Sequence, residues 1–293
     1  RPRHGVDLRP DARIYFDQRG LPVVSALDRE VLALMRDVSE RIIMPRHRTL
    51  KATEIIEKAD DDLVTIADRE AEVALAEGLA KLHPEAAIVG EEAVHADPSV
   101  MDRLSGTCWI IDPIDGTANF ASGSGHFGIM IALSEGGAAQ AGWIYDPQRD
   151  RLCAAHLGQG ATIDGEDVLA RSSGANPPRL AAMTKFMALD QRSRFETEIL
   201  PHYTLVQAPG AACEQYPLTV LGEHDLAIYE RTLPWDHAAG NLFLNEAGGT
   251  CLRLDGSPYR VDDGRRGMIG AANRALYDQL IARLAVAGYQ PAT

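Results

Sequence analysis

The sequence has few cysteines, no long apolar run and a deficit of basic residues. Its four cysteines, Cys108, Cys153, Cys213 and Cys251, are widely spaced, and no two of them form a CxxC pair. Each lies among apolar neighbours, so we expect buried free thiols rather than disulfides or a zinc site, and therefore a reducing, cytoplasmic compartment. No run of about 18 apolar residues occurs, which argues against a transmembrane helix or a membrane partner. The chain begins at Arg1 rather than at a methionine, so its first residues do not decide targeting.

Acidic residues outnumber basic ones, with 42 Asp and Glu against 29 Lys and Arg and a formal net charge of -13 at pH 7. Such a surface repels nucleic-acid phosphates, so we expect no nucleic-acid partner. A small anionic substrate is compatible with this charge if local cations offset the field. The hydrophobic content of 45% in 293 residues suffices for one large or two modest domains.

The apolar pattern divides the chain into two halves. Helical spacing predicts helices over 26–43 and 68–83, with a charged loop between them. Short apolar runs separated by turn residues predict strands at 86–90, 126–133, 140–145, 151–156 and 161–163, largely as an antiparallel meander. After the Ser-, Gly- and Pro-rich stretch 171–179, strands and helices alternate to the end, with a helix predicted from about 237 and a last one at 274–286. We therefore predict an N-terminal α+β half, 1–172, and a C-terminal α/β half, 173–293.

The stretch "WIIDPIDGTANF" at 109–120 places two carboxylates at the end of a buried strand. Pro113 favours an extended Asp112 and is expected to end the ladder there. Two carboxylates a few ångström apart repel each other by about 1–4 kcal/mol, whereas a hard divalent cation such as Mg²⁺ reverses that sign. The turn that follows Asp115 supplies backbone N–H groups that can hold a phosphate. The alternative is plain turn chemistry, which Asp, Pro and Gly also favour.

Four more acids occur in similar settings along the chain. Glu91 and Glu92 follow an apolar strand in "VGEEA", where solvated surface acids are the ordinary alternative. Asp68 in "DLVTIAD" and Asp236 in "PWDHAAG" precede helical runs, where a helix N-cap is the ordinary alternative. Taken together, the order of these motifs favours one shared metal site.

The motifs "DLVTIAD", "VGEEA", "WIIDPIDGTANF" and "PWDHAAGNLFLNEAGG" resemble, in order and spacing, those of the inositol monophosphatase family over about residues 58–250. The resemblance implies a layered αβαβα sandwich of the sugar-phosphatase type, with an N-terminal antiparallel sheet half, a C-terminal α/β half and the metals between them. It also implies a lithium-sensitive, Mg²⁺-dependent phosphatase with two to three ions per site, and assembly as a homodimer.

The resemblance also implies roles for individual residues. One Mg²⁺ would be held by Glu91, Asp112 and the backbone carbonyl of Ile114. A second would be held by Asp112, Asp115 and Asp236. Asp68 and Glu92 would support a third, weaker ion through water. Thr117 would orient or deprotonate the attacking water, and the N–H groups of Gly116 and Thr117 would grip the phosphate. The substrate's other end would contact Gly210, Ala211, Ala212 and Glu230.

The sequence departs from the family pattern beside the substrate. The segment "ERTLPWD" is a residue shorter than in animal members and carries Arg231 and Pro234. The lysine expected near the first motif has Lys58 as its nearest match. No clear basic pocket for a second phosphate is evident, although Arg231 and Lys185 are candidate cations. His237 either orients Asp236 or points to solvent.

We therefore expect a Mg²⁺-dependent phosphomonoesterase that hydrolyses a small polyol phosphate by in-line attack of metal-bound water, with inositol monophosphate as the default. Histidinol phosphate, fructose 1,6-bisphosphate and 3′(2′),5′-bisphosphate nucleotides are alternative substrates. A non-catalytic regulatory or binding protein on the same fold is the alternative of another class. The presence of every expected acid and of Thr117 argues against it.

Overall fold

The computed structural model describes residues 15–16, 22–23, 26–50, 52–59 and 62–291. Two mixed sheets dominate it, and the first has seven strands in the order β11-β10-β9-β8-β7-β6-β5. Its strands are β5 (Ala87–Gly90), β6 (Thr107–Asp115), β7 (Gly128–Glu135), β8 (Ala138–Asp146), β9 (Arg151–His156), β10 (Gly160–Ile163) and β11 (Glu166–Asp167). The pairings from β6 to β11 are antiparallel and that of β5 with β6 is parallel.

The second sheet has five strands in the order β13-β12-β14-β16-β15. Its strands are β12 (Arg179–Ala182), β13 (Thr204–Val206), β14 (Leu226–Tyr229), β15 (Thr250–Arg253) and β16 (Met268–Ala271). β12 runs parallel to both β13 and β14, so the carboxyl ends of these three strands meet at one edge. The pairings of β16 with β14 and β15 are antiparallel.

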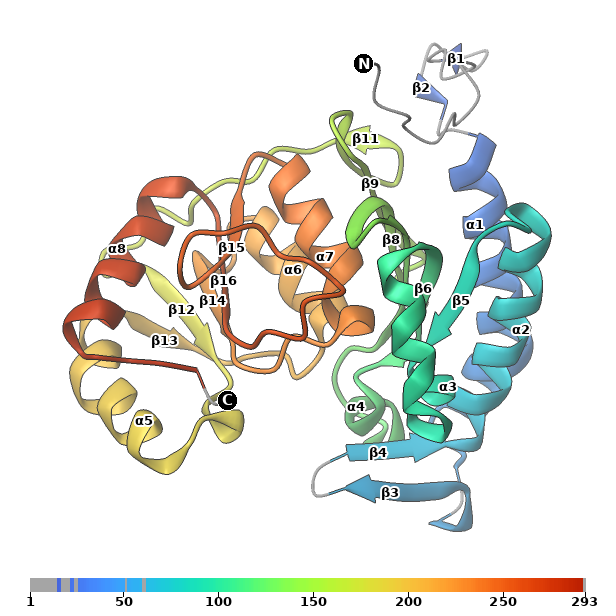
Figure 1. Ribbon diagram of the computed structural model, residues 1–293, viewed down its shortest axis with the longest axis horizontal. Helices are drawn as coiled ribbons and strands as arrows, with labels where there is room; N and C mark the ends of the chain where they lie inside the picture. Colours follow the sequence, from blue (N-terminus) through green and yellow to red (C-terminus); the bar gives the residue numbers. More distant parts are fainter. Residues whose placement is uncertain (1–14, 17–21, 24–25, 51, 60–61, 292–293) are drawn as a thin grey trace.

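The helices form three layers around the two sheets. The helices are α1 (Ala26–Val38), α2 (Ile66–Leu82), α3 (Glu91–Ala96), α4 (Thr117–Ser122), α5 (Leu189–Arg194), α6 (Ala212–Val220), α7 (Pro234–Glu246) and α8 (Arg274–Val286). Figure 1 shows α1 and α2 outside the first sheet, α6 and α7 between the sheets, and α5 and α8 outside the second. This is the predicted αβαβα sandwich.

Short elements complete the chain. Two small antiparallel pairs are β1 (Tyr15–Phe16) with β2 (Pro22–Val23) and β3 (Ile55–Ala59) with β4 (Asp62–Thr65). π-helical turns follow α1 and α5 at Ser39–Ile43 and Phe195–Ile199. The 3-10 helices are Met44–Arg46, Ala52–Glu54, Pro98–Ser105, Thr184–Phe186 and Leu200–His202.

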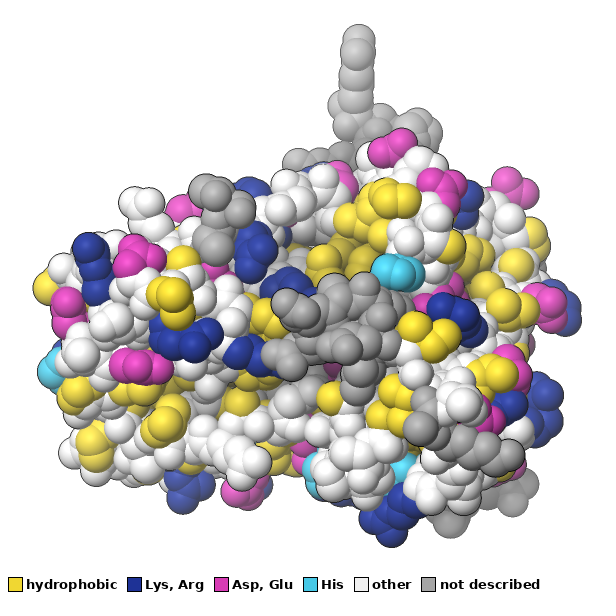
Figure 2. Space-filling model, turned by 90° about the horizontal axis from the view of Figure 1, so that it is seen from below, with side chains coloured by type: hydrophobic (Ala, Val, Ile, Leu, Met, Phe, Trp, Pro, Cys, Tyr) yellow, Lys and Arg dark blue, Asp and Glu magenta, His cyan; other side chains and the backbone are white. Residues whose placement is uncertain are grey.

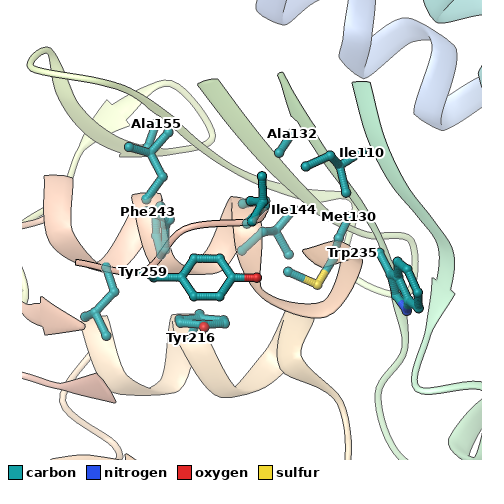
Figure 3. Packing of buried hydrophobic residues seen from close by; sticks show 14 of the residues in the cluster. Ile110, Met130, Ala132, Ile144, Ala155, Tyr216, Trp235, Phe243 and Tyr259 are labelled. Carbon is teal, nitrogen blue, oxygen red and sulfur yellow. The ribbon is translucent and has the colours of Figure 1, made fainter. Parts of the chain in front are cut away.

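Strand β6 shows why the first sheet has one hydrophobic core on each of its two faces. Alternate residues of a strand point to opposite faces. Trp109 and Ile111 therefore pack with α1 and α2, whereas Ile110 packs in the core shared with α6 and α7. Figure 3 shows Ile110, Met130 and Ile144 of the sheet in the same cluster as Tyr216 and Phe243 of these two helices. Burial on both faces explains the unbroken apolar run before Asp112.

Most predicted elements are confirmed with shifts of about two residues at their ends, but one hairpin was not predicted and two boundaries that bear on the site are wrong. The predicted charged loop after the first helix contains the β3–β4 hairpin, because alternation in so short a segment is hard to distinguish from loop sequence. β6 continues through Pro113 to Asp115 rather than ending at Asp112. α7 begins at Pro234 rather than near 237, since Pro is favoured in the first helical turn.

Two further sequence expectations bear on the chemistry of the chain. All four cysteines are buried and free, as predicted, since burial in apolar cores leaves them without partners for a disulfide. Within the described part of the chain, no helix is long and apolar enough to cross a membrane. The division into halves at 172 and 173 stays a prediction.

Candidate metal and phosphate site

Two of the predicted acids follow paired positions on neighbouring strands of the first sheet. β5 and β6 are parallel, with Gly90 opposite Ile111. The next residues are Glu91, which begins α3 directly after β5, and Asp112, which is still within β6, so they lie one strand spacing, about 4.8 Å, apart. Both side chains line one cavity of about 170 Å³. Parallel pairing of β5 and β6 thus explains how two acids 21 positions apart in the sequence come together.

A β-bulge directs Asp112 and Asp115 to the same side of the sheet. Asp112 pairs with Met130 and Asp115 pairs with Gly128, so β6 has one residue more than β7 across this interval. Without the extra residue, positions three apart would face opposite sides. The N–H of Ile114 donates to Asp112 Oδ1 at 3.1 Å, which supports the bulged backbone. Pro113 does not end the strand as predicted, because the ladder resumes beyond it at Asp115.

The third acid comes from the helix layer between the sheets. Asp236 is in the first turn of α7, and its carboxylate lies with those of Asp112 and Asp115 so that one oxygen of each is within 4.8 Å of the others. The N-cap of α7 is Leu233, so Asp236 does not fill the N-cap role that was its alternative. The N–H of Cys213 in α6 donates to Asp115 Oδ2 at 2.6 Å. Both central helices therefore converge on the end of β6.

Burial and mutual repulsion make this group of carboxylates hard to ionise together. Asp112 is 2% exposed, and its pKa is raised well above the ordinary value by burial first and then by the charges of Glu91, Asp115 and Asp236. Burial also raises the pKa of Asp115, although the N–H of Cys213 opposes the shift. A set of carboxylate oxygens with the Ile114 carbonyl beside it fits a hard divalent cation, which would remove the repulsion. The donor set therefore fits the Mg²⁺ that the sequence predicts.

Thr117 lies directly beside these acids. Gly116 adopts a left-handed φ of 84° as the N-cap of α4, which orients the first turn of that helix towards the cavity. The Thr117 hydroxyl lies 3.0 Å from the carbonyl of Ile114 and 3.1 Å from Asp68 Oδ1. Burial raises the pKa of Asp68 to about 6. The N-cap of α2 is Thr65, and Asp68 is the third helical residue, so the N-cap alternative for Asp68 is wrong.

Glu92 is not among the residues that line the cavity, and its backbone is held by Glu72, which was not among the predicted site residues. The charge of Glu92 adds to the raised pKa of Asp68, which places the two carboxylates near each other. The carboxylate of Glu72 accepts the N–H groups of Glu92 at 2.7 Å and of Ala93 at 2.8 Å. A Cβ at Gly90 would lie 2.3 Å from the Glu72 carboxyl carbon. The signal available in the sequence was helical spacing, because Glu72 is one turn after Asp68 on α2.

The predicted substrate contacts line the same cavity as the carboxylates. Gly210, Ala211 and Ala212 follow β13, and Glu230 follows β14. Glu230 is only 3% exposed, and the hydroxyl of Tyr289 donates to its Oε2 at 2.5 Å. Tyr289 lies near the end of the chain, and no local motif pointed to it. Ligands often bind at the carboxyl ends of strands in open α/β sheets, and this part of the cavity follows that rule.

His237 is placed differently from either sequence interpretation. It is 4% exposed, so it does not point to solvent. Its Nδ1 lies 2.8 Å from the hydroxyl of Tyr216, and its Nε2 lies 3.0 Å from the carbonyl of Arg231. The imidazole of His237 therefore holds the backbone of Arg231 rather than the carboxylate of Asp236. The side chain of Lys58 lies outside the described residues.

A second acidic cluster, formed by His126, Asp146 and Glu214, has a different character. Arg149 donates to both carboxylates at 2.7 and 2.8 Å, and Arg151 donates to Glu214 at 2.7 Å. These two guanidinium groups already supply positive charge, so the cluster is an ion-pair network. It joins the end of β8 to α6 and thereby steadies the helix that holds Asp115.

Comparison with known proteins agrees with this geometry. A sequence profile described as the inositol monophosphatase family matches residues 25–288. The chain is 31% identical over 228 residues to an inositol-1-monophosphatase of Bacillus subtilis, covering 77% of this chain and 84% of that protein. It is 33% identical over 235 residues to a histidinol-phosphatase of Chlorobaculum parvum, covering 80% and 88%. A structure of an inositol monophosphatase from Zymomonas mobilis superposes with a TM-score of 0.72 and 28% identity, covering 89% of this chain and 100% of that one.

Proposed function

Because the chain belongs to the inositol monophosphatase family and is a phosphatase of that family, we propose that it hydrolyses a small polyol phosphate with Mg²⁺, by in-line attack of water. Inositol monophosphate is the default substrate. Histidinol phosphate, fructose 1,6-bisphosphate and 3′(2′),5′-bisphosphate nucleotides are the alternatives. The observation that carries the proposal is the convergence of the Asp112, Asp115 and Asp236 carboxylates within 4.8 Å in one cavity beside Thr117.

The donors for the metal are the carboxylates of Glu91, Asp112, Asp115 and Asp236, with the carbonyl of Ile114. Bound Mg²⁺ would neutralise phosphate charge and favour ionisation of water near pH 7. The chain's own residues then position the reactants. The N–H groups of Gly116 and Thr117, both at the cavity wall, bind phosphate oxygens. Phosphoryl transfer needs positioning and charge more than a covalent nucleophile.

Thr117 and Asp68 form the proposed route for the water's proton. The Thr117 hydroxyl lies 3.1 Å from Asp68 Oδ1, so it can accept a hydrogen bond from water while it donates to Asp68. Asp68, with its pKa raised to about 6, is ionised at neutral pH and still basic enough to share that proton. The Glu92 charge nearby keeps that pKa raised. Asp68 and Glu92 are proposed to act through Thr117 and are not among the residues that line the cavity.

The test is phosphate release with Mg²⁺ from a panel of inositol 1-phosphate, histidinol phosphate, fructose 1,6-bisphosphate and adenosine 3′,5′-bisphosphate. Asp112→Asn is the blank, and a chelator removes the metal. We expect release from at least one substrate, lost in the variant and in the chelator. Release that persists in folded Asp112→Asn would refute the proposed mechanism. No release from any substrate by folded, Mg²⁺-loaded protein would favour the regulatory alternative.

Homodimer assembly stays a prediction, which analytical ultracentrifugation tests.

A further inference from the structure

Two cations share one aromatic ring in the wall of the cavity. The Nζ of Lys185 lies 4.8 Å from the centroid of the Phe186 ring, and the Cζ of Arg231 lies 4.8 Å from the same centroid. The two charges are therefore no more than twice that distance apart. All three side chains line the cavity that holds the carboxylates. Contact with the ring stabilises both cations where a substrate's second group would lie.

The fold brings these cations together from distant parts of the chain. Lys185 and Phe186 lie in the 3-10 helix after β12, and Arg231 follows β14. β12 and β14 are parallel neighbours, with Ala182 opposite Ile228, so both segments leave the sheet at the same edge. Figure 2 shows Lys and Arg side chains on the half at the left, which carries the second sheet.

Arg231 also connects this wall to the reaction centre. One of its Nη atoms lies 3.9 Å from Asp236 Oδ2, and its carbonyl is held by His237 Nε2 at 3.0 Å. The guanidinium therefore stands between a proposed metal ligand and the Phe186 ring. With a substrate's phosphate at the carboxylates and its leaving group extending past Arg231 towards Lys185, the cations would face the leaving group rather than the phosphate that is transferred.

Because the whole protein is acidic, the paired cations Lys185 and Arg231 in the cavity wall bear on which substrates can bind. The formal net charge is -13, and five carboxylates, including that of Glu230, line the cavity, so an anion entering it meets a negative field. Paired cations counter that field at one point. A neutral polyol needs only hydroxyl partners, such as the Glu230 carboxylate held by Tyr289. An ammonium group, as in histidinol phosphate, would be repelled by this wall.

We propose that Lys185 and Arg231, held on Phe186, form a subsite for a second anionic group, a phosphate or carboxylate on the leaving group. The preferred substrates are then phosphomonoesters that carry such a group. This inference rests on the proposed phosphatase function and specifies its substrate class. Lys and Arg bind phosphate and carboxylate by charge-assisted hydrogen bonds, which are stronger than bonds to neutral hydroxyl groups.

The experiment compares matched substrates that differ only in the second anion. The pairs are fructose 1,6-bisphosphate with fructose 1-phosphate, and adenosine 3′,5′-bisphosphate with adenosine 3′-phosphate. For at least one pair we expect the wild type to prefer the doubly anionic member about tenfold or more in kcat/KM. Lys185→Gln should lower kcat/KM for the doubly anionic member about fivefold or more, and should leave kcat/KM for the singly phosphorylated member within about twofold of the wild type. Lys185→Gln combined with Arg231→Gln should remove the preference.

Controls separate the subsite from general electrostatics. Lys81→Gln and Arg274→Gln remove exposed charges on α2 and α8, outside the cavity, and should leave the preference unchanged. Turnover without a preference for the second anion in either pair, or a preference that survives the double substitution, would overturn this inference and leave the proposed function intact. No release from any member of the pairs or from inositol 1-phosphate would overturn both.

Discussion

The two ends of the cavity are built by different means. At the carboxylate end, Asp112 and Asp115 belong to one strand, and a single bulge turns them to the same side. At the cationic end, Lys185 and Arg231 lie in separate segments that meet only because β12 and β14 are neighbours. The arrangement of the carboxylates depends on the local backbone of β6. The arrangement of the cations depends on side chains in the segments that follow β12 and β14. The reaction centre is therefore hard to vary, whereas the leaving-group end can change by substitution in loops.

Gly116 shows how closely the two ends are joined. Its φ is 84°, a conformation that favours glycine, and an added Cβ would lie 2.9 Å from the Cβ of Ala211 and 3.0 Å from the carbonyl of His126. Nearby, Asn119 donates to the carbonyls of His126 at 2.7 Å and of Pro209 at 3.0 Å. The proposed phosphate-binding turn at Gly116 thus packs directly against the segment 209–211 that is proposed to contact the substrate.

The largest effect should come from Asp112→Asn at the carboxylate end. Loss of this carboxylate should lower kcat/KM about 10³-fold or more for every substrate, because metal charge stabilisation contributes several kcal/mol. Asp102→Asn, at an exposed acid outside the cavity, is the control and should keep normal activity.

The same variant should be more stable than the wild type when metal is removed. Folding raises the pKa of Asp112, so its ionised form is disfavoured in the folded state. That cost begins as the pH rises above the ordinary carboxyl pKa and is present at pH 7.5. In a chelator at pH 7.5, Asp112→Asn should therefore melt at a higher temperature than the wild type. A lower melting temperature would contradict the repulsion inferred here.

A smaller effect is expected from Thr117, which contacts the reacting water in the proposed mechanism. Thr117→Ala should lower kcat by about 10²-fold with little change in KM, since a positioned proton-transfer group contributes about that much. Thr117→Ser keeps the hydroxyl that lies 3.1 Å from Asp68, so it should recover most of the rate. Equal loss in both variants would assign the effect to packing instead of the hydroxyl.

The smallest effect should appear at the leaving-group end, with Tyr289→Phe. Its hydroxyl donates to Glu230 at 2.5 Å, and losing that bond costs about 1 kcal/mol, or roughly fivefold in KM for a polyol phosphate. The kcat should be unchanged, because Tyr289 is outside the reaction centre. Tyr203→Phe, in the same apolar core but away from the cavity, is the control. A change in kcat without a change in KM would exclude this positioning role.

The contrast between the two ends also explains what the sequence could predict. The acids beside β5 and β6 lie in short ordered motifs, and the structure brings Glu91, Asp112 and Asp115 to one cavity. The bulge was missed because Pro113 also signals a strand end. Its effect depends on pairing with β7, which is not visible in β6 alone.

Long-range contacts account for most of the other omissions. Tyr289 is 59 positions from Glu230, and the approach of Lys185 and Arg231 to Phe186 depends on strand order in the second sheet. Lys185 and Arg231 are recognisable as candidate cations in the sequence, but their proximity cannot be predicted from it. Glu72 was within reach of helical spacing, yet its contact with the backbone at Glu92 requires the packing of α2 beside β5.

The most direct test of the central claim is a calorimetric titration of the metal-free protein with Mg²⁺, without substrate. Because burial and mutual repulsion raise the pKa values of Asp112 and Asp115, metal binding must displace protons from these carboxyl groups, and fewer of them as the pH rises. Titrations in two buffers of different ionisation enthalpy should show Mg²⁺ binding with proton release at pH 6, less release at pH 8, and much weaker binding in Asp112→Asn. Identical Mg²⁺ binding by the wild type and Asp112→Asn would contradict a metal centre at these carboxylates.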